Sequence, residues 1–142
     1  MDKLMEGIMK KAIAYKQIIL TVHNEVGALA EISKILSKAG INLLAICGYA
    51  VDNKGIIMFV SQDHDKAKKL LKTKNYDVRE EDVVLLTVDN KTGALQSIVE
   101  RIAQGGIDLT LIYGSAEKKG KTSSIVLVAE DNDMVLQMIN LM

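Results

Sequence analysis

The chain has 142 residues, 49% of them hydrophobic and 25% charged, which is the composition of a globular protein and excludes an intrinsically disordered one. Its 18 basic and 18 acidic residues balance and only 4% of residues are aromatic, so we expect binding neither to nucleic acid nor to a membrane surface. A lone cysteine supplies no intramolecular disulfide and no structural zinc site, so we expect a reducing cytoplasm, no metal and no cofactor.

An amphipathic leader, residues 1–16, opens the chain. Its apolar side chains recur at helical spacing, which predicts a helix, and charged residues interrupt them, which argues against a secretory signal. The most apolar stretch of the chain, residues 41–51, is well short of the ~18 residues that a membrane-spanning helix needs.

The rest of the chain repeats itself. Residues 20–50 and 86–116 are identical at 14 of 31 positions with a constant offset of 66, and residues 57–71 align with 125–139 at an offset of 68. We interpret this repeat as a tandem duplication with two domains, residues 17–81 and 82–142.

Each copy contains the same elements in the same order. In the first copy we expect strands at 17–22, 42–51, 56–61 and 76–81, and helices that start near Gly27 and Asp63. In the second copy we expect strands at 83–88, 108–116 and 124–129, and helices that start near Gly93 and Asp131. Gly40 and Gly106 suit a left-handed end of the first helix in each copy. The βαββαβ order predicts an α+β, ferredoxin-like fold in which both helices cover one face of an antiparallel sheet.

Two surfaces of this predicted fold need a cover. The second copy stops at Met142, before the position where the first copy begins its fourth strand, and its last helix is apolar nearly all round. A bare sheet edge promotes aggregation, so we expect either the leader or another subunit to lie there. The strand at 42–51 is also apolar on both faces, which sheet-on-sheet contact between two chains would bury.

The strand-to-helix segments carry a family resemblance. NEVGALAEISKILSKAGINL at 24–43 and NKTGALQSIVERIAQGGIDL at 90–109, each followed by a hairpin and a second helix, resemble the ACT domain over nearly all of residues 17–141. The resemblance implies two tandem copies of a small regulatory module that binds an amino-acid effector and is not an enzyme. It also implies pairing of such domains, here as a homodimer, and regulation of a partner enzyme in amino-acid metabolism.

Gly27 and Gly93 mark the corner where the first strand of each copy turns into a helix. A glycine lets the backbone approach a ligand closely, and the first amides of a helix have no partner within it, so they suit a carboxylate. An Asn precedes each glycine by three residues, and an Asn or Asp follows it by fifteen. We therefore expect the ligand-binding residues to be Asn24, Glu25, Val26, Gly27, Ala28, Leu29, Asn42, Asn90, Lys91, Thr92, Gly93, Ala94, Leu95 and Asp108.

The resemblance bears most directly on two of these positions. In the serine-sensing ACT domains of phosphoglycerate dehydrogenase, asparagines at the offsets of Asn24 and Asn42 hold the effector. Asp108 departs from that pattern and either meets an α-ammonium group or caps neighbouring backbone. Val26 and Thr92 stand where the family often has a proline, which leaves the identity of the effector open.

Other interpretations of these residues stay open. Asn24 and Asn90 also suit a helix cap or a turn, and the two glycines could serve the turn alone. The sequence contains no G-x-S-x-G, H-E-x-x-H, C-x-x-C or phosphate-binding glycine motif, so no catalytic site is expected. The alternative function is a regulatory or structural subunit that acts through protein contacts, because the N-terminal motif also resembles the small subunit of acetolactate synthase.

Overall fold

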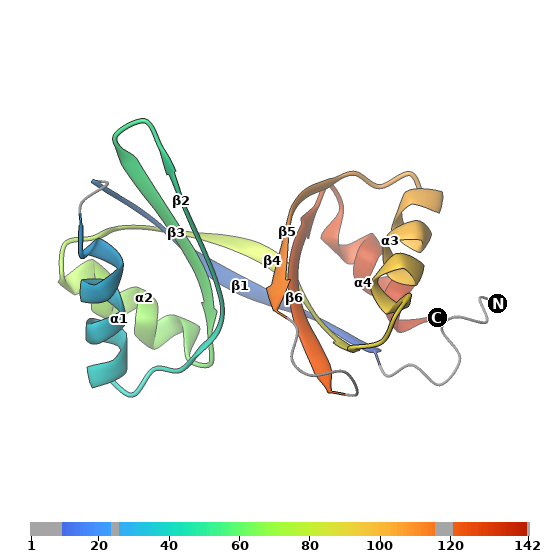
Figure 1. Ribbon diagram of the computed structural model, residues 1–142, viewed down its shortest axis with the longest axis horizontal. Coiled ribbons are helices and arrows are strands. Elements are labelled where there is room, and N and C mark those ends of the chain that lie inside the picture. The colour runs from blue at the N-terminus through green and yellow to red at the C-terminus, as the bar shows by residue number, and fades with distance from the viewer. Residues whose placement is uncertain (1–9, 24–25, 116–120, 142) are drawn as a thin grey trace. The chain divides into compact units, whose positions relative to one another are not determined.

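The computed structural model describes residues 10–23, 26–115 and 121–141 (Figure 1). Within these residues the chain divides into two compact units. The first unit comprises residues 16–81, and the second unit comprises the described residues from Asp82 onward together with residues 10–15. Two long strands, β1 (Lys10–His23) and β4 (Asp77–Asp89), therefore contribute one part to each unit.

The first unit places two helices on one face of a sheet. Besides its parts of β1 and β4 it contains α1 (Ala28–Lys38), β2 (Leu43–Val51), β3 (Lys54–Ser61) and α2 (His64–Thr73). The strand order is β2-β3-β1-β4, and β3 is antiparallel to both of its neighbours. Ile18 and Phe59 are cross-strand partners and share a buried cluster with Leu36 of α1 and Leu71 of α2.

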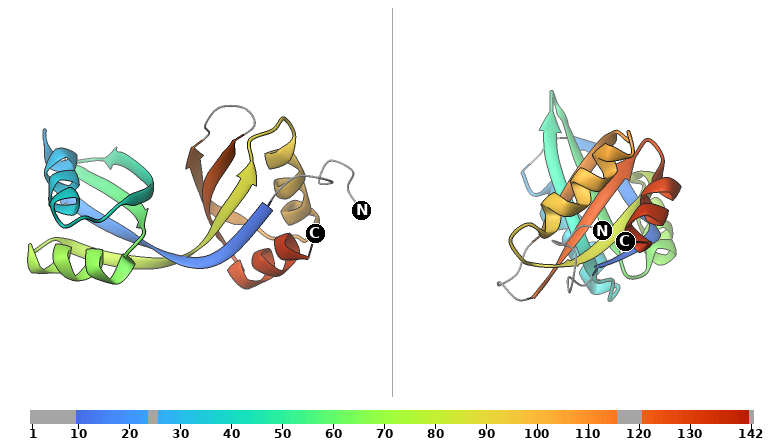
Figure 2. Two further views of the ribbon diagram at one scale, coloured as in Figure 1. Left: turned by 90° about the horizontal axis from the view of Figure 1, so that it is seen from below. Right: turned by 90° about the vertical axis from the view of Figure 1, so that its right-hand side faces the viewer.

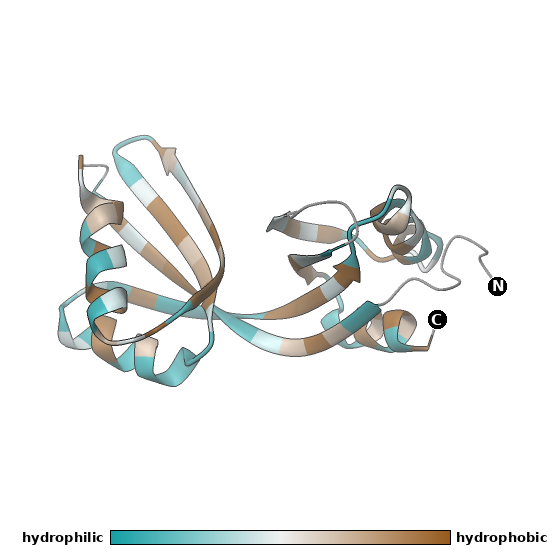
Figure 3. Ribbon diagram, turned by 60° about the horizontal axis from the view of Figure 1, so that its bottom comes forward, coloured by the Kyte–Doolittle hydropathy of each residue, from teal (hydrophilic) through white to brown (hydrophobic). Residues whose placement is uncertain are grey.

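The second unit has the same arrangement. Besides its parts of β1 and β4 it contains α3 (Ala94–Gln104), β5 (Leu109–Ser115), β6 (Thr122–Ala129) and α4 (Asn132–Asn140). Its strand order is β1-β4-β6-β5, and Figure 3 shows hydrophobic residues along its strands. Leu86 and Leu127 form its core with Ile98 of α3 and Ile139 of α4. The predicted α+β, ferredoxin-like fold with an antiparallel sheet and four helices is confirmed, whereas duplication as its origin stays a prediction.

Capping residues set the ends of the helices as the sequence predicts. The carboxylate of Asp63 accepts a hydrogen bond from the Lys66 amide at 3.2 Å, and Asp131 caps α4 in the same way. Gly40 and Gly106 both follow a helix with a φ of 72°, the left-handed conformation expected of them. None of the helices in the described residues is long and apolar enough to cross a membrane.

The prediction of a helical leader is wrong for residues 10–16, which form the start of β1 (Figure 2). Residues 1–9 lie outside the described residues. Ala12 is 4% exposed in the core of the second unit, where its backbone N–H donates to Asn140 Oδ1 at 3.3 Å and its carbonyl accepts from Asn140 Nδ2 at 3.0 Å. Residues 10–15 thus supply the fourth strand of the second unit, because pairing at an open sheet edge outweighs a local helical pattern.

The sequence predicts separate strands at 76–81 and 83–88, and this separation is wrong. β4 runs through Glu80, Glu81 and Asp82 as one continuous strand. No glycine or proline interrupts residues 76–88, so nothing in the backbone breaks the extended conformation there.

Candidate functional site

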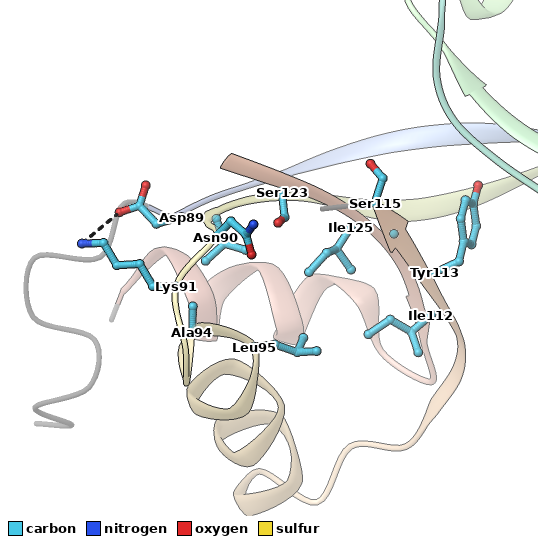
Figure 4. A pocket seen from close by; sticks show the side chains of 12 residues that line it. Asp89, Asn90, Lys91, Ala94, Leu95, Ile112, Tyr113, Ser115, Ser123 and Ile125 are labelled. Carbon is cyan, nitrogen blue, oxygen red and sulfur yellow. Dashed lines mark ion pairs between the residues drawn. The ribbon is translucent and has the colours of Figure 1, made fainter. Parts of the chain in front are cut away.

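A cavity of about 350 Å³ lies in the second unit, where β4 turns into α3 (Figure 4). Its walls come from the end of β4, the first turn of α3 and the facing parts of β5 and β6. The residues that line it are Val88, Asp89, Asn90, Lys91, Ala94, Leu95, Ile112, Tyr113, Gly114, Ser115, Ser123 and Ile125. We call this space the corner cavity.

The backbone of the corner leaves hydrogen-bond donors at the start of α3. Gly93 precedes the helix with a φ of 86°, and no side chain caps the helix there. The Ala94 amide donates to the Lys91 carbonyl at 3.1 Å, but the amides of Leu95 and Gln96 have no hydrogen-bond partner among the described residues. Unpaired amides at the positive end of a helix dipole favour an anionic group.

Ser123 adds a side-chain hydroxyl to these donors. It stands opposite Val88 in the sheet, faces the corner cavity and is only 8% exposed (Figure 4). Its hydroxyl makes no hydrogen bond in the described part of the chain. Because this hydroxyl faces the corner cavity, it is available to donate a hydrogen bond to a ligand that binds there.

Ser123 is not among the binding residues expected from the sequence. It follows the β5–β6 turn, and its counterpart in the first copy is Gly55, so the repeat gave no reason to select it. The period of two along β6 could have revealed it. Ser123 and Ile125 are two residues apart and therefore lie on the same face of the strand, the face that the helices cover.

Aliphatic side chains form much of the wall. Leu95 and Ile112 point toward one another across the corner cavity, and Ile125 lies between this pair and Ser123 in the view of Figure 4. Tyr113 and Ser115 project from the opposite face of β5, so they border the cavity mainly through their backbone.

The charged lining residues are already paired. Lys91 Nζ lies 3.8 Å from Asp89 Oδ2, and the two side chains are 51% and 20% exposed. In Figure 4 this ion pair lies at the end of the corner cavity opposite Ile112 and Tyr113. No cluster of His, Cys, Asp and Glu that could hold a metal ion occurs among the described residues.

The second copy has four of its seven predicted site residues on the corner cavity: Asn90, Lys91, Ala94 and Leu95. Thr92 and Gly93 belong to the same loop but do not line the cavity. Asp108 lies elsewhere, because it precedes β5 at the end of the strand remote from the corner. Its carbonyl accepts a hydrogen bond from the Glu130 amide at 2.9 Å.

The first copy shows the same separation. His23, the last residue of β1, pairs with Lys54 at the start of β3. Leu43, which follows Asn42, pairs with Ser61 at the other end of β3. Asn42 therefore lies far from the corner within its own unit and instead lines a separate cavity of about 450 Å³ beside the end of α1.

The corner of the first copy is described only in part. Asn24 and Glu25 lie outside the described residues. Val26 is fully exposed, and Gly27 has a φ of 90° before α1, which begins with Ala28 and the half-exposed Leu29. The backbone of this corner thus turns as it does at Gly93.

Comparison with known proteins finds a family match for part of the chain. Residues 16–75 match the ACT domain. This ACT match covers most of the first unit and less than half of the chain, so an ACT assignment for the second unit stays a prediction from the repeat. No curated protein matches the chain in sequence.

Solved structures share the fold over nearly the whole chain. A protein of Bacteroides thetaiotaomicron has 28% sequence identity and a TM-score of 0.84, with 92% of this chain and 89% of that chain covered. The regulatory subunits of aspartate kinase from Thermus thermophilus and Thermus flavus have 13% and 12% identity and TM-scores of 0.65 and 0.62. The coverage is 94% of this chain and 95% of that chain for the first, and 95% of both for the second. At these low identities the two kinase subunits show a shared fold.

Proposed function

We propose that the chain is a non-catalytic regulatory protein that binds a small amino acid at the corner cavity of its second unit. The observation that carries the proposal is that one cavity is lined both by Ser123, whose hydroxyl faces it, and by the start of α3, where the Leu95 amide has no hydrogen-bond partner among the described residues. The α-carboxylate of the ligand would accept hydrogen bonds from these groups, and the side-chain oxygen of Asn90 would accept one from its α-ammonium group. The ACT match of residues 16–75 supports a regulatory amino-acid-binding role.

The corner of the first unit is a second candidate site in this proposal. Asn24, Glu25 and the residues that follow, up to Leu29, would bind a ligand in the same way, because Gly27 turns the backbone as Gly93 does. Asn42 and Asp108 would take part only if another domain brought them to a corner, as pairing of ACT domains would.

Regulation follows if the ligand binds more tightly to one arrangement of the domains than to another. The protein would act as a homodimer and transmit the change to a partner enzyme. Its fold, shared with regulatory subunits of aspartate kinase, makes an enzyme of amino-acid biosynthesis the first class of partner to test. A subunit that acts through protein contacts alone would bind such an enzyme without responding to amino acids.

Thermal unfolding of the full chain against each of the twenty amino acids tests the proposal. A ligand present at 100 times its Kd stabilises the folded chain by about 2.7 kcal/mol, so the midpoint should rise with ligand concentration. Ser123→Ala should weaken binding about tenfold, because the carboxylate loses a hydrogen bond of roughly 1.5 kcal/mol.

Ser124→Ala is the matched control, since Ser124 is adjacent but lies on the other face of β6 and does not line the corner cavity. The proposal fails if no amino acid shifts the midpoint. The assignment of the site fails if Ser123→Ala and Ser124→Ala bind a stabilising ligand equally well.

A further inference from the structure

We infer that the corner cavity selects an amino acid with an uncharged aliphatic side chain, of the size of valine, leucine, isoleucine or methionine. This inference rests on the proposed function, because it names the ligand class of that site. It follows from how the polar and apolar groups are distributed in the cavity.

The polar groups gather toward the end of β4, and the aliphatic groups lie beyond them. Asn90 and Ser123 lie close together in Figure 4, whereas Leu95 and Ile112 face each other farther along the corner cavity. A ligand held by its carboxylate and ammonium groups at the polar end would extend its side chain between these aliphatic walls. Contact with apolar walls favours aliphatic groups, and a single methylene in such a pocket changes affinity about tenfold or more.

A charged ligand side chain would find no unpaired partner there. Asp89 and Lys91 are the charged residues of the lining, and they form an ion pair with each other. A charged side chain between Leu95 and Ile112 would meet apolar surface and gain no counter-charge, which favours an uncharged ligand over lysine, arginine, aspartate and glutamate.

The size of the corner cavity fits a single amino acid. Its volume of about 350 Å³ lies at the lower end of the roughly 300–1,000 Å³ that ligand pockets occupy. Gly114 contributes to this space, because it lies opposite Ile125 on the helix-facing side of β5, where a larger residue would project a side chain inward.

Calorimetric titration of the full chain with leucine, valine, alanine, lysine and aspartate tests the inference. Leucine or valine should bind most tightly, and lysine and aspartate should bind at least tenfold more weakly. Ile112→Thr removes apolar surface but keeps a β-branched residue at a 42% exposed position, so the fold should tolerate it. This variant should weaken leucine binding about tenfold and leave alanine binding almost unchanged, because alanine does not reach Ile112.

Ile13→Thr is the matched control, since Ile13 is a similarly exposed strand residue that does not line the corner cavity, and it should bind leucine as the parent does. If lysine or aspartate binds best, and Ser123→Ala weakens that binding while Ile112→Thr does not, the inference is overturned and the proposed function stands. If none of the five amino acids shows binding, the inference is overturned. Absence of binding for all twenty overturns the proposed function as well.

Discussion

Gly48 and Gly114 occupy equivalent positions in β2 and β5, yet their surroundings differ. A Cβ atom on Gly114 would lie 2.8 Å from the Ser124 carbonyl oxygen and 3.0 Å from Ile125 Cγ1. The nearest atom to a Cβ on Gly48 is the Ile56 carbonyl oxygen at 3.8 Å, an ordinary contact distance. The repeated glycine is therefore a packing requirement in the second copy and not in the first.

Gly114→Ala should lower the free energy of unfolding by about 1–3 kcal/mol, because the backbone of β6 must move to admit the methyl group. Gly48→Ala should be neutral or slightly stabilising, within about 1 kcal/mol, since alanine loses less backbone entropy than glycine. Urea unfolding curves of the two variants provide the comparison. Equal losses in both would contradict the packing argument.

At the scale of elements, an ionic cluster joins α2 to β4 in the first unit. Glu80 of β4 places Oε2 at 2.7 Å from His64 Nε2 and Oε1 at 3.0 Å from Lys68 Nζ, and Lys16 Nζ lies 3.8 Å away. The hydrogen bond with His64, followed by that with Lys68, lowers the pKa of Glu80 from 4.5 to about 2. The folded chain therefore binds fewer protons at this carboxyl group than the unfolded chain does.

This difference predicts a loss of stability in acid. The contribution of the Glu80 carboxylate to the free energy of unfolding is fully present above pH 4.5 and disappears as the pH falls toward about 2. Glu80→Gln should flatten that part of the stability profile, which unfolding midpoints measured between pH 6 and pH 2 would record. Glu130→Gln, which removes an exposed carboxylate outside the cluster, is the control. An unchanged acid profile in Glu80→Gln would refute the argument.

At the scale of the whole molecule, β2 in the first unit and β5 in the second are outer strands, each with a single neighbouring strand, β3 and β6 respectively. Neither strand contains a charged residue or a proline, the devices that usually protect a sheet edge. Tyr49 and Val51 of β2 are about half exposed. These features support the proposed homodimer, with the outer strand of one copy covered by another copy.

Sedimentation velocity should show a dimer of the parent chain at micromolar concentrations. Replacing both Tyr49 and Val51 by lysine should shift the chain toward monomer, because like charges would meet across a symmetric interface. Leu141→Lys is the control, since Leu141 is 85% exposed at the C-cap of α4 and belongs to neither β2 nor β5. A parent chain that sediments as a monomer would rule out the homodimer.

The sequence by itself determined the local elements, because capping residues, glycines and alternating apolar residues act over a few positions. Asp63, Asp131, Gly40 and Gly106 all lie where the pattern predicts a helix end. The βαββαβ order of each unit and the strand-to-helix corners at Gly27 and Gly93 followed from the same local signals.

Only the tertiary structure decided which segments complete each unit and what the corner cavity contains. Residues 10–16 have a helical pattern, but an unpaired sheet edge more than 60 residues away makes residues 10–15 the fourth strand of the second unit. Ser123 enters the corner cavity because β6 pairs with β4, a segment more than 30 residues earlier in the chain, which places Ser123 opposite Val88. Asn42 and Asp108 fail to reach their corners because β2 and β5 begin at the opposite end of the sheet, a relation set by strand direction. Contacts between distant segments depend on chain topology, and topology is not encoded in any short window of sequence.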